Sequence, residues 1–200
     1  MATVDASMAT GYPVQVNFAS GSNRRSRLTV LFRPILAIPA IIVLYLHLIG
    51  FLITTVLSWF AILLTGRYPS GFHSYGVNTM RLTACVMSYL LFLTDEYPPW
   101  SGSGSKAQNY PVQYSVSYPG KSSRLTVLFR YILAIPAFVF TVVILFVAEI
   151  FVIIAWVAIL ITGRYPPGLE GFVQGAVRCY HRLYGYMYFL VDPYPPFSIT

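Results

Sequence analysis

The sequence predicts an all-α integral membrane protein of two tandem repeats, each an interfacial helix plus a transmembrane helical hairpin, which gives four spans. Three observations predict this fold class. The 200-residue chain is 56% hydrophobic and 10% charged, whereas a soluble domain carries about 25% charged residues. Two long stretches, 34–66 and 131–163, contain a single charged residue between them, Glu149. The third observation is an internal repeat.

Two motifs recur at a constant spacing. Ser26–Arg33 returns 97 residues later as Ser123–Arg130, and Ala61–Pro69 returns with one change as Ala158–Pro166. Because the spacing is the same for both motifs, the chain contains a duplicated unit, and both copies are expected to fold alike. The expected divisions are a flexible N-terminal tail (1–11), a first repeat (12–100), a Gly/Ser-rich linker (101–109) and a second repeat (110–200).

Each repeat is expected to begin with a strand and an interfacial helix. Residues 12–18 and 110–118 alternate in the manner of strands, and two such strands could pair outside the membrane. An interfacial helix is expected over 26–38 and 123–135. Arginine side chains at such a helix can reach lipid phosphates. The candidate phosphate contacts are Arg27, Arg33, Arg124 and Arg130.

The apolar stretches supply the first span of each hairpin. As helices, 39–65 and 136–162 would each be about 40 Å long, enough to cross about 30 Å of hydrocarbon with some tilt. Pro39 and Pro136 allow the chain to turn from the interface into the bilayer. The segments 71–93 and 168–190 are long enough to return across the membrane.

The returning segments carry small and polar residues at alternating spacings of four and three, which places them on one helical face. This polar seam includes Asn78, Arg81 and Arg178, and we expect it to face protein. Two interpretations of the arginines stay open. They could donate to backbone carbonyls or snorkel, or they could meet an acidic group of a partner, a lipid phosphate or an anionic cofactor.

Basic residues predict the orientation of the spans. With four spans, both termini and the linker share one side, which holds eight basic residues, whereas the hairpin turns hold Arg67 and Arg164. The positive-inside rule then places both termini in the cytoplasm, with the protein in the inner (plasma) membrane. The repeats would be parallel, related by an axis along the membrane normal. No secretory signal pattern opens the chain, so the first span is expected to direct insertion.

The motifs resemble a bacterial membrane family labelled DUF4389. The resemblance rests on Trp59–Pro69 and Leu93–Trp100, and again on Trp156–Pro166 and Leu190–Phe197. It covers nearly the whole chain apart from the first ten residues and the linker. The family has no established function, so the resemblance implies the fold and no activity. In the second copy, Val191 and Pro193 replace Thr94 and Glu96, which argues against chemistry by a Thr-Asp pair.

One pair of charges is present only in the second copy. Glu149 takes the place of Leu52, and Arg182 takes the place of Cys85. In an antiparallel hairpin both would lie about 21 Å from the turn. Since intramembrane charges usually pair, we expect a Glu149–Arg182 ion pair. It would act as a clamp on the hairpin or, alternatively, as a proton or anion relay.

Candidate cofactor ligands are few. His47 and His181 fall within spans and could ligate haem or a chlorophyll magnesium, but neither recurs in the other copy, which favours packing roles. Cys85 and Cys179 form no CxxC pattern, which argues against a disulfide or a zinc site. The sequence contains no P-loop, GxGxxG, GxSxG or HExxH motif. Anionic lipid accounts for the positive charge without nucleic acid.

The resulting functional hypothesis is a non-catalytic accessory or scaffolding subunit of a larger membrane complex. Two alternatives remain. One is a small transporter or lipid-handling protein that uses the cleft between the repeats. The other is a pigment- or haem-binding subunit. No metal is expected, and a bound lipid, pigment or haem is the cofactor that these alternatives would require.

Overall fold

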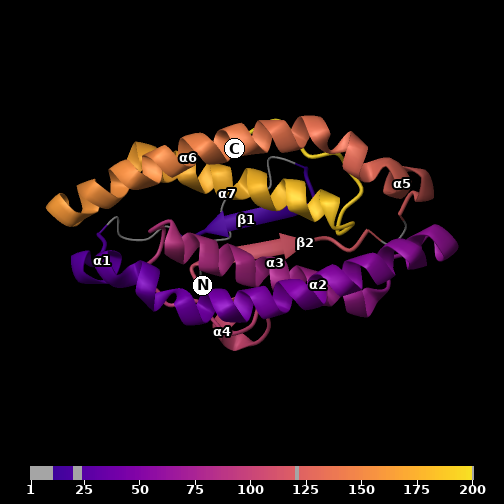
Figure 1. Cartoon of the computed structure of the whole chain (residues 1–200), viewed down its shortest axis with the longest axis horizontal. Helices are drawn as coiled ribbons and strands as arrows, with labels where there is room; N and C mark the ends of the chain where they lie inside the picture. Colours follow the sequence, from indigo (N-terminus) through magenta and orange to yellow (C-terminus); the bar gives the residue numbers. More distant parts are fainter. Residues whose placement is uncertain (1–10, 20–23, 120–121, 200) are drawn as a thin grey trace.

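A computed structural model describes residues 11–19, 24–119 and 122–199 (Figure 1). Most of these residues are helical. The elements follow in the order β1 (Val14–Phe18), α1 (Arg27–Leu36), α2 (Ile38–Thr65), α3 (Ser70–Leu90), α4 (Ser105–Gln108), β2 (Val112–Val116), α5 (Arg124–Leu133), α6 (Ile135–Thr162) and α7 (Pro167–Met187). The two repeats contain the same order of strand, short helix, long helix and second long helix, which confirms the duplication.

Local signals set the ends of the long helices. Pro39 lies in the first turn of α2, where its missing N–H breaks no helical hydrogen bond. Gly66 ends α2 in the left-handed conformation, with φ 71°, and its N–H donates to the carbonyl of Ile62. Gly163 ends α6 in the same way, with φ 72°. A residue with a Cβ is strained at such an angle, so glycine is the residue that allows each helix to end here.

The four long helices lie along one direction, and α3 and α7 form the interior. α2 packs along α3, α6 packs along α7, and α3 contacts α7 (Figure 1). One hydrophobic core contains residues of both repeats, among them Ile62, Ile159 and Leu190. The two copies are therefore a single packed unit.

The two strands pair with each other, as the sequence suggested. β1 and β2 are antiparallel, with Val16 opposite Tyr114. The side chains of Val14, Val16, Val112 and Tyr114 are buried, whereas Asn17 and Ser115 are exposed. β2 packs on α3 and β1 packs on α7. The sheet therefore covers the middle of the helices and does not stand apart from them.

The relative direction of the repeats differs from the expected parallel arrangement. α1 lies at one end of the long axis and α5 at the other, and α2 and α6 run in opposite directions (Figure 1). The N–H of Arg25 donates to the carbonyl of Gly163 at 2.9 Å, and that of Ser122 donates to the carbonyl of Gly66 at 3.0 Å. Each interfacial helix therefore starts beside the helix end of the other copy. The expectation that the two repeats are parallel was therefore wrong.

The path of the linker explains this reversal. After α3, the chain crosses the face of that helix through α4 and continues as β2 toward the far end. Ala107 is fully buried, and Gly102 contacts the backbone of Asn78. The linker is therefore packed against the helices, and it carries the start of the second repeat to the opposite end of the molecule.

Among the described helices, two segments are long and apolar enough to cross a membrane: Ile38–Thr65 and Arg124–Thr162. In each, only 17% of the most apolar window is buried, whereas a core helix of a soluble protein is mostly buried. The other two expected spans, α3 and α7, do not qualify. They carry Arg81, Arg178 and Arg182 and are mostly covered by the rest of the chain.

Candidate functional site

Each repeat holds one buried arginine paired with an aspartate. The Nη2 of Arg33 donates to Asp95, and its Nη1 donates to the carbonyls of Tyr89 and Thr94, both at 2.9 Å. In the second copy, Arg130 pairs with Asp192 and donates to the carbonyls of Tyr186 and Val191. Both arginines are fully buried. They have no surface with which to bind a lipid phosphate, so that expectation was wrong for Arg33 and Arg130.

Aromatic rings complete the enclosure of these guanidinium groups. The Cζ of Arg33 lies 4.5 Å from the centroid of the Tyr89 ring and 5.4 Å from that of Phe92. Phe92 has φ 62°, a conformation that costs free energy for a residue with a Cβ. Asp95 also accepts the N–H of Ser26, the residue before α1, at 3.0 Å. This cluster therefore fastens α1 to the end of α3 and has a structural role.

The other two candidate phosphate contacts remain on the surface. Arg27 and Arg124 are exposed. The Nε of Arg27 lies beside Gly163, and that of Arg124 beside Gly66. Each arginine thus sits at the C-terminus of a long helix of the other copy, where a positive charge is favourable. Contact between these two residues and lipid remains a prediction.

The expected Glu149–Arg182 ion pair does not form. Glu149 is exposed on α6, whereas Arg182 is 5% exposed and donates to the carbonyl of Ser198 at 3.2 Å. The described ion pairs are Arg25–Glu170, Arg33–Asp95 and Arg130–Asp192. Glu149 thus lies on the outer surface of α6, whereas Arg182 faces the interior of the protein. The number of residues from a turn predicts the position of a side chain along the helix axis, but it does not predict the face of the helix on which that side chain lies.

Extended segments of the chain cover the polar seam. The Nε of Arg81 donates to the carbonyl of Tyr114 in β2, and its Nη1 donates to the carbonyl of Gly102 and to Asn78. The Nε of Arg178 donates to the carbonyl of Val16 in β1. The seam therefore faces protein, as predicted. Of the two interpretations left open for these arginines, donation to backbone carbonyls is the one observed.

The histidines are held by nearby helical groups. His47 is half-buried, with Nδ1 bonded to the carbonyl of Val43 and its ring stacked on Tyr75. His181 is fully buried, with Nδ1 bonded to the carbonyl of Val177. Its ring lies among those of Tyr114 and Tyr180. Among the described residues, no group of three or more His, Cys, Asp or Glu is placed to hold a metal ion.

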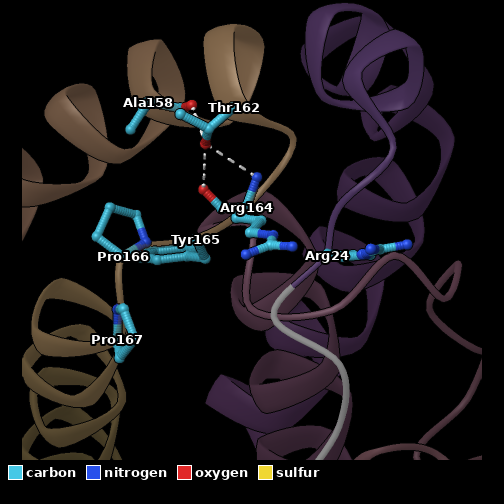
Figure 2. A pocket seen from close by; sticks show the side chains of 7 residues that line it. All are labelled: Arg24, Ala158, Thr162, Arg164, Tyr165, Pro166 and Pro167. Atoms are coloured by element: carbon cyan, nitrogen blue, oxygen red, sulfur yellow. Dashed lines mark hydrogen bonds between the residues drawn. The ribbon is translucent and has the colours of Figure 1, made fainter.

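A pocket opens where α6 turns into α7 (Figure 2). It has a volume of about 590 Å³, and its two charged lining residues are Arg24 and Arg164. An antiparallel bridge places the backbones of these arginines side by side. Sequence reasoning treated Arg164 only as a marker of orientation and did not associate it with Arg24. No local signal joins them, because they come from different copies.

Glu170, in the first turn of α7, forms an ion pair with Arg25. The Nη2 of Arg25 donates to Glu170 at 3.0 Å, while the same side chain donates to the carbonyls of Phe92 and Leu93. Burial raises the pKa of the Glu170 carboxyl, and Arg25 opposes that shift. Burial also raises the pKa of Tyr165, which keeps its phenol protonated. The pocket is consequently lined by two cations and a neutral phenol.

Comparison with known proteins agrees with the repeat architecture. A family model described as "Domain of unknown function (DUF4389)" matches the chain twice, at residues 27–101 and 124–198. The chain belongs to the DUF4389 family. No curated protein and no solved structure matches the chain.

The two DUF4389 copies each contain one complete arginine–aspartate cluster. Arg33 and Asp95 fall in the first matched range, and Arg130 and Asp192 fall in the second. The strands β1 and β2 lie outside both ranges, as does Arg24. The basic pocket therefore combines the second DUF4389 copy with a residue that precedes the first.

Proposed function

We propose that this protein is a non-catalytic accessory subunit of a larger complex in the plasma membrane, with α2 and α6 in the bilayer. The observation that carries the proposal is the apolar outer surface of these two helices. It includes Leu46, Ile49 and Ile53 on α2 and Phe146, Ile153 and Ile161 on α6, each 57–70% exposed. Contiguous apolar patches of this kind mark contact with membrane or protein.

A row of exposed polar residues on the two strands supports the presence of a partner subunit. Asn17 and Ser115 are exposed on the two strands, and Figure 1 places the strands midway along the long helices. If α2 and α6 cross the bilayer along their length, this row lies at the depth of the hydrocarbon. Exposed strands at that depth are tolerated only where protein or a water-filled cavity covers them. A second membrane subunit over the sheet satisfies this requirement.

The alternatives receive less support. A transporter that uses the cleft between the repeats needs space there, whereas the core residues of both copies pack together. Haem ligation by His181 needs room beside the ring, which two tyrosine rings occupy.

The test combines extraction with cysteine labelling. Cys85 and Cys179 are buried, so single cysteines can be introduced at Asn17 and Ser115 without a reactive background. We expect a water-soluble maleimide to label them poorly in native membranes and readily in the purified chain. Gly71→Cys, at an exposed position beside the α2–α3 turn with nothing within 4 Å of its Cβ, is the matched control and should react in both. Gentle detergent extraction should recover a co-migrating protein that mild dissociation removes.

Two results would contradict the proposal. Release of the chain by alkaline carbonate would show that it is not embedded in the bilayer. Equal labelling of Asn17→Cys and Gly71→Cys in native membranes would show that nothing covers the sheet.

A further inference from the structure

We infer that the pocket at the α6–α7 turn binds the phosphate group of an anionic phospholipid. The inference rests on the proposed placement of α6 in the bilayer and adds a ligand to it. The pocket lies directly beyond the C-terminal end of α6. At the end of a membrane helix, the surrounding layer is that of the lipid headgroups.

Two exposed arginines, Arg24 and Arg164, line this pocket. The bridge between Arg24 and Arg164, and the hydrogen bond from the N–H of Arg25 to Gly163, fix both backbones. Both side chains are exposed. In Figure 2 the side chain of Arg164 extends toward the backbone of Arg24, whose own side chain extends away from it. Guanidinium groups bind phosphate oxygens in a bidentate geometry and are the preferred residues for this contact.

The charge around the pocket favours an anion. None of the described residues that line it is acidic, and Glu170 is paired with Arg25. Arg27, beside Gly163, adds a further positive charge at the same end. The N-terminus of α7 also begins here, because Pro167 lines the pocket and is the first residue of that helix. Helix N-termini attract phosphate groups.

The remaining lining suits the apolar part of a lipid. Ala158, Pro166 and Pro167 are apolar, and most of the lining surface is contributed by apolar groups. Tyr165 is 1% exposed, and its phenol oxygen has no hydrogen-bond partner in the described residues. A free phosphate ion would use the arginines alone, whereas a phospholipid would also occupy the apolar wall.

The first copy provides a matched control site. Arg67 occupies the equivalent turn at the other end of the molecule and is exposed. There the hydroxyl of Tyr118 donates to the carbonyl of Tyr68 at 2.5 Å, so a tyrosine lies against that turn. Arg67→Gln therefore removes the same kind of charge from the same motif without touching the pocket.

The experiment measures lipid retention by the full chain. Wild type, Arg24→Gln/Arg164→Gln and Arg67→Gln are reconstituted in phosphatidylcholine vesicles containing a minor share of phosphatidylglycerol. Lipids that remain bound after transfer to detergent are then counted by native mass spectrometry. We expect wild type to retain phosphatidylglycerol, the double variant to bind it about tenfold more weakly, and Arg67→Gln to change binding less than about twofold.

The outcomes separate this inference from the proposed function. If the double variant inserts normally and retains as much phosphatidylglycerol as wild type, the lipid site is overturned and the membrane role stands. An equal loss in Arg67→Gln would show diffuse attraction by surface charge and would also overturn the site. Displacement of the lipid by millimolar inorganic phosphate would identify a free-phosphate site instead. Failure of wild type to enter phosphatidylcholine vesicles would overturn both proposals.

Discussion

Gly102 lies on the segment that crosses α3, whereas Gly175 lies on α7 itself. In each copy, the segment that follows the last long helix crosses back over that helix, and a glycine lies at the contact. A Cβ on Gly102 would lie 1.7 Å from the carbonyl oxygen of Asn78 in α3, and a Cβ on Gly175 in α7 would lie 2.6 Å from that of Ile199. The repeat spacing aligns Asn78 with Gly175 and Gly102 with Ile199. Each crossing needs one glycine. The first copy places it on the crossing segment, and the second places it on the helix.

This relationship predicts that Gly102→Ala and Gly175→Ala are both strongly destabilising. The added methyl group meets backbone atoms, which cannot move aside as a side-chain end can. We expect a loss of about 2–4 kcal/mol in the free energy of unfolding, at or above the usual range for overpacking. Gly71→Ala and Gly168→Ala are matched controls, because nothing lies within 4 Å of a Cβ at either position. Thermal unfolding in detergent should separate the two pairs, and equal midpoints would refute the argument.

The arginine–aspartate clusters predict a second stability effect. Asp95→Asn leaves the guanidinium of Arg33 fully buried with its carbonyl partners but without its countercharge. Loss of the partner of a buried charge costs about 3–5 kcal/mol. Because the Asp95 side chain is 35% exposed, we expect about 1–3 kcal/mol after allowance for solvent screening. Denaturant unfolding measures this change.

The neighbouring Glu96→Gln serves as the control for Asp95→Asn. Glu96 is also exposed and forms none of the described ion pairs, so it should change stability by less than about 0.5 kcal/mol. Asp192→Asn should reproduce the effect of Asp95→Asn because the second cluster has the same geometry. If Asp95→Asn and Glu96→Gln were equally mild, the clusters would not fasten the interfacial helices.

The absence of a Glu149–Arg182 contact predicts independent effects in a double-mutant cycle. Glu149→Leu and Arg182→Cys introduce the residues found in the first copy. Glu149→Leu should be neutral or stabilising in membranes, because it removes an exposed carboxyl from an apolar helix. Arg182→Cys should destabilise, because it removes the hydrogen bond to Ser198. The coupling free energy should be under about 0.5 kcal/mol. A coupling free energy of about 2 kcal/mol would instead show that Glu149 and Arg182 interact.

The sequence predicts local structure in this chain better than it predicts the path between elements. Gly66 and Gly163 mark helix ends because the left-handed conformation is a property of the residue itself. The pairing of β1 and β2 followed from two matching alternating segments. The direction of the second repeat did not, since it depends on how the linker 101–109 and β2 pack against α3. Predicting orientation from a count of basic residues assumes that the linker stays on one side of the membrane. Here Gly102 and Ala107 pack against the helices, and the linker carries the second repeat to the opposite end of the molecule.

The candidate site was likewise predictable only where the signal lies within one repeat. Arg33 and Asp95 both recur in the second copy at the same spacing, and this joint recurrence was the available signal for the buried pair. The pair was missed because composition alone assigns arginines near an apolar helix to lipid phosphate. The pocket could not be predicted, since Arg24 and Arg164 are 140 positions apart in the sequence and meet only because the repeats are antiparallel.

Arg25 predicts a pH-dependent contribution to stability. Its second-copy counterpart is Ser122, so Arg25→Ser is the natural substitution. It removes the bonds to Phe92, Leu93 and Glu170 and should cost about 1–3 kcal/mol at neutral pH. Burial raises the pKa of Glu170 above its ordinary value of 4.5, and Arg25 opposes this shift. In Arg25→Ser the pKa of Glu170 should therefore rise further.

An acid whose folded-state pKa is raised stabilises the fold when protonated, and this contribution is lost as the pH rises through the folded pKa. The deficit of Arg25→Ser should therefore shrink as the pH falls from neutral through the raised pKa of Glu170 toward 4.5. Urea unfolding over this range measures it. Adding Glu170→Gln should abolish the pH dependence, since glutamine does not titrate. A deficit that is constant with pH in Arg25→Ser, or one that still varies after Glu170→Gln, would mean that Arg25 does not act through this carboxylate.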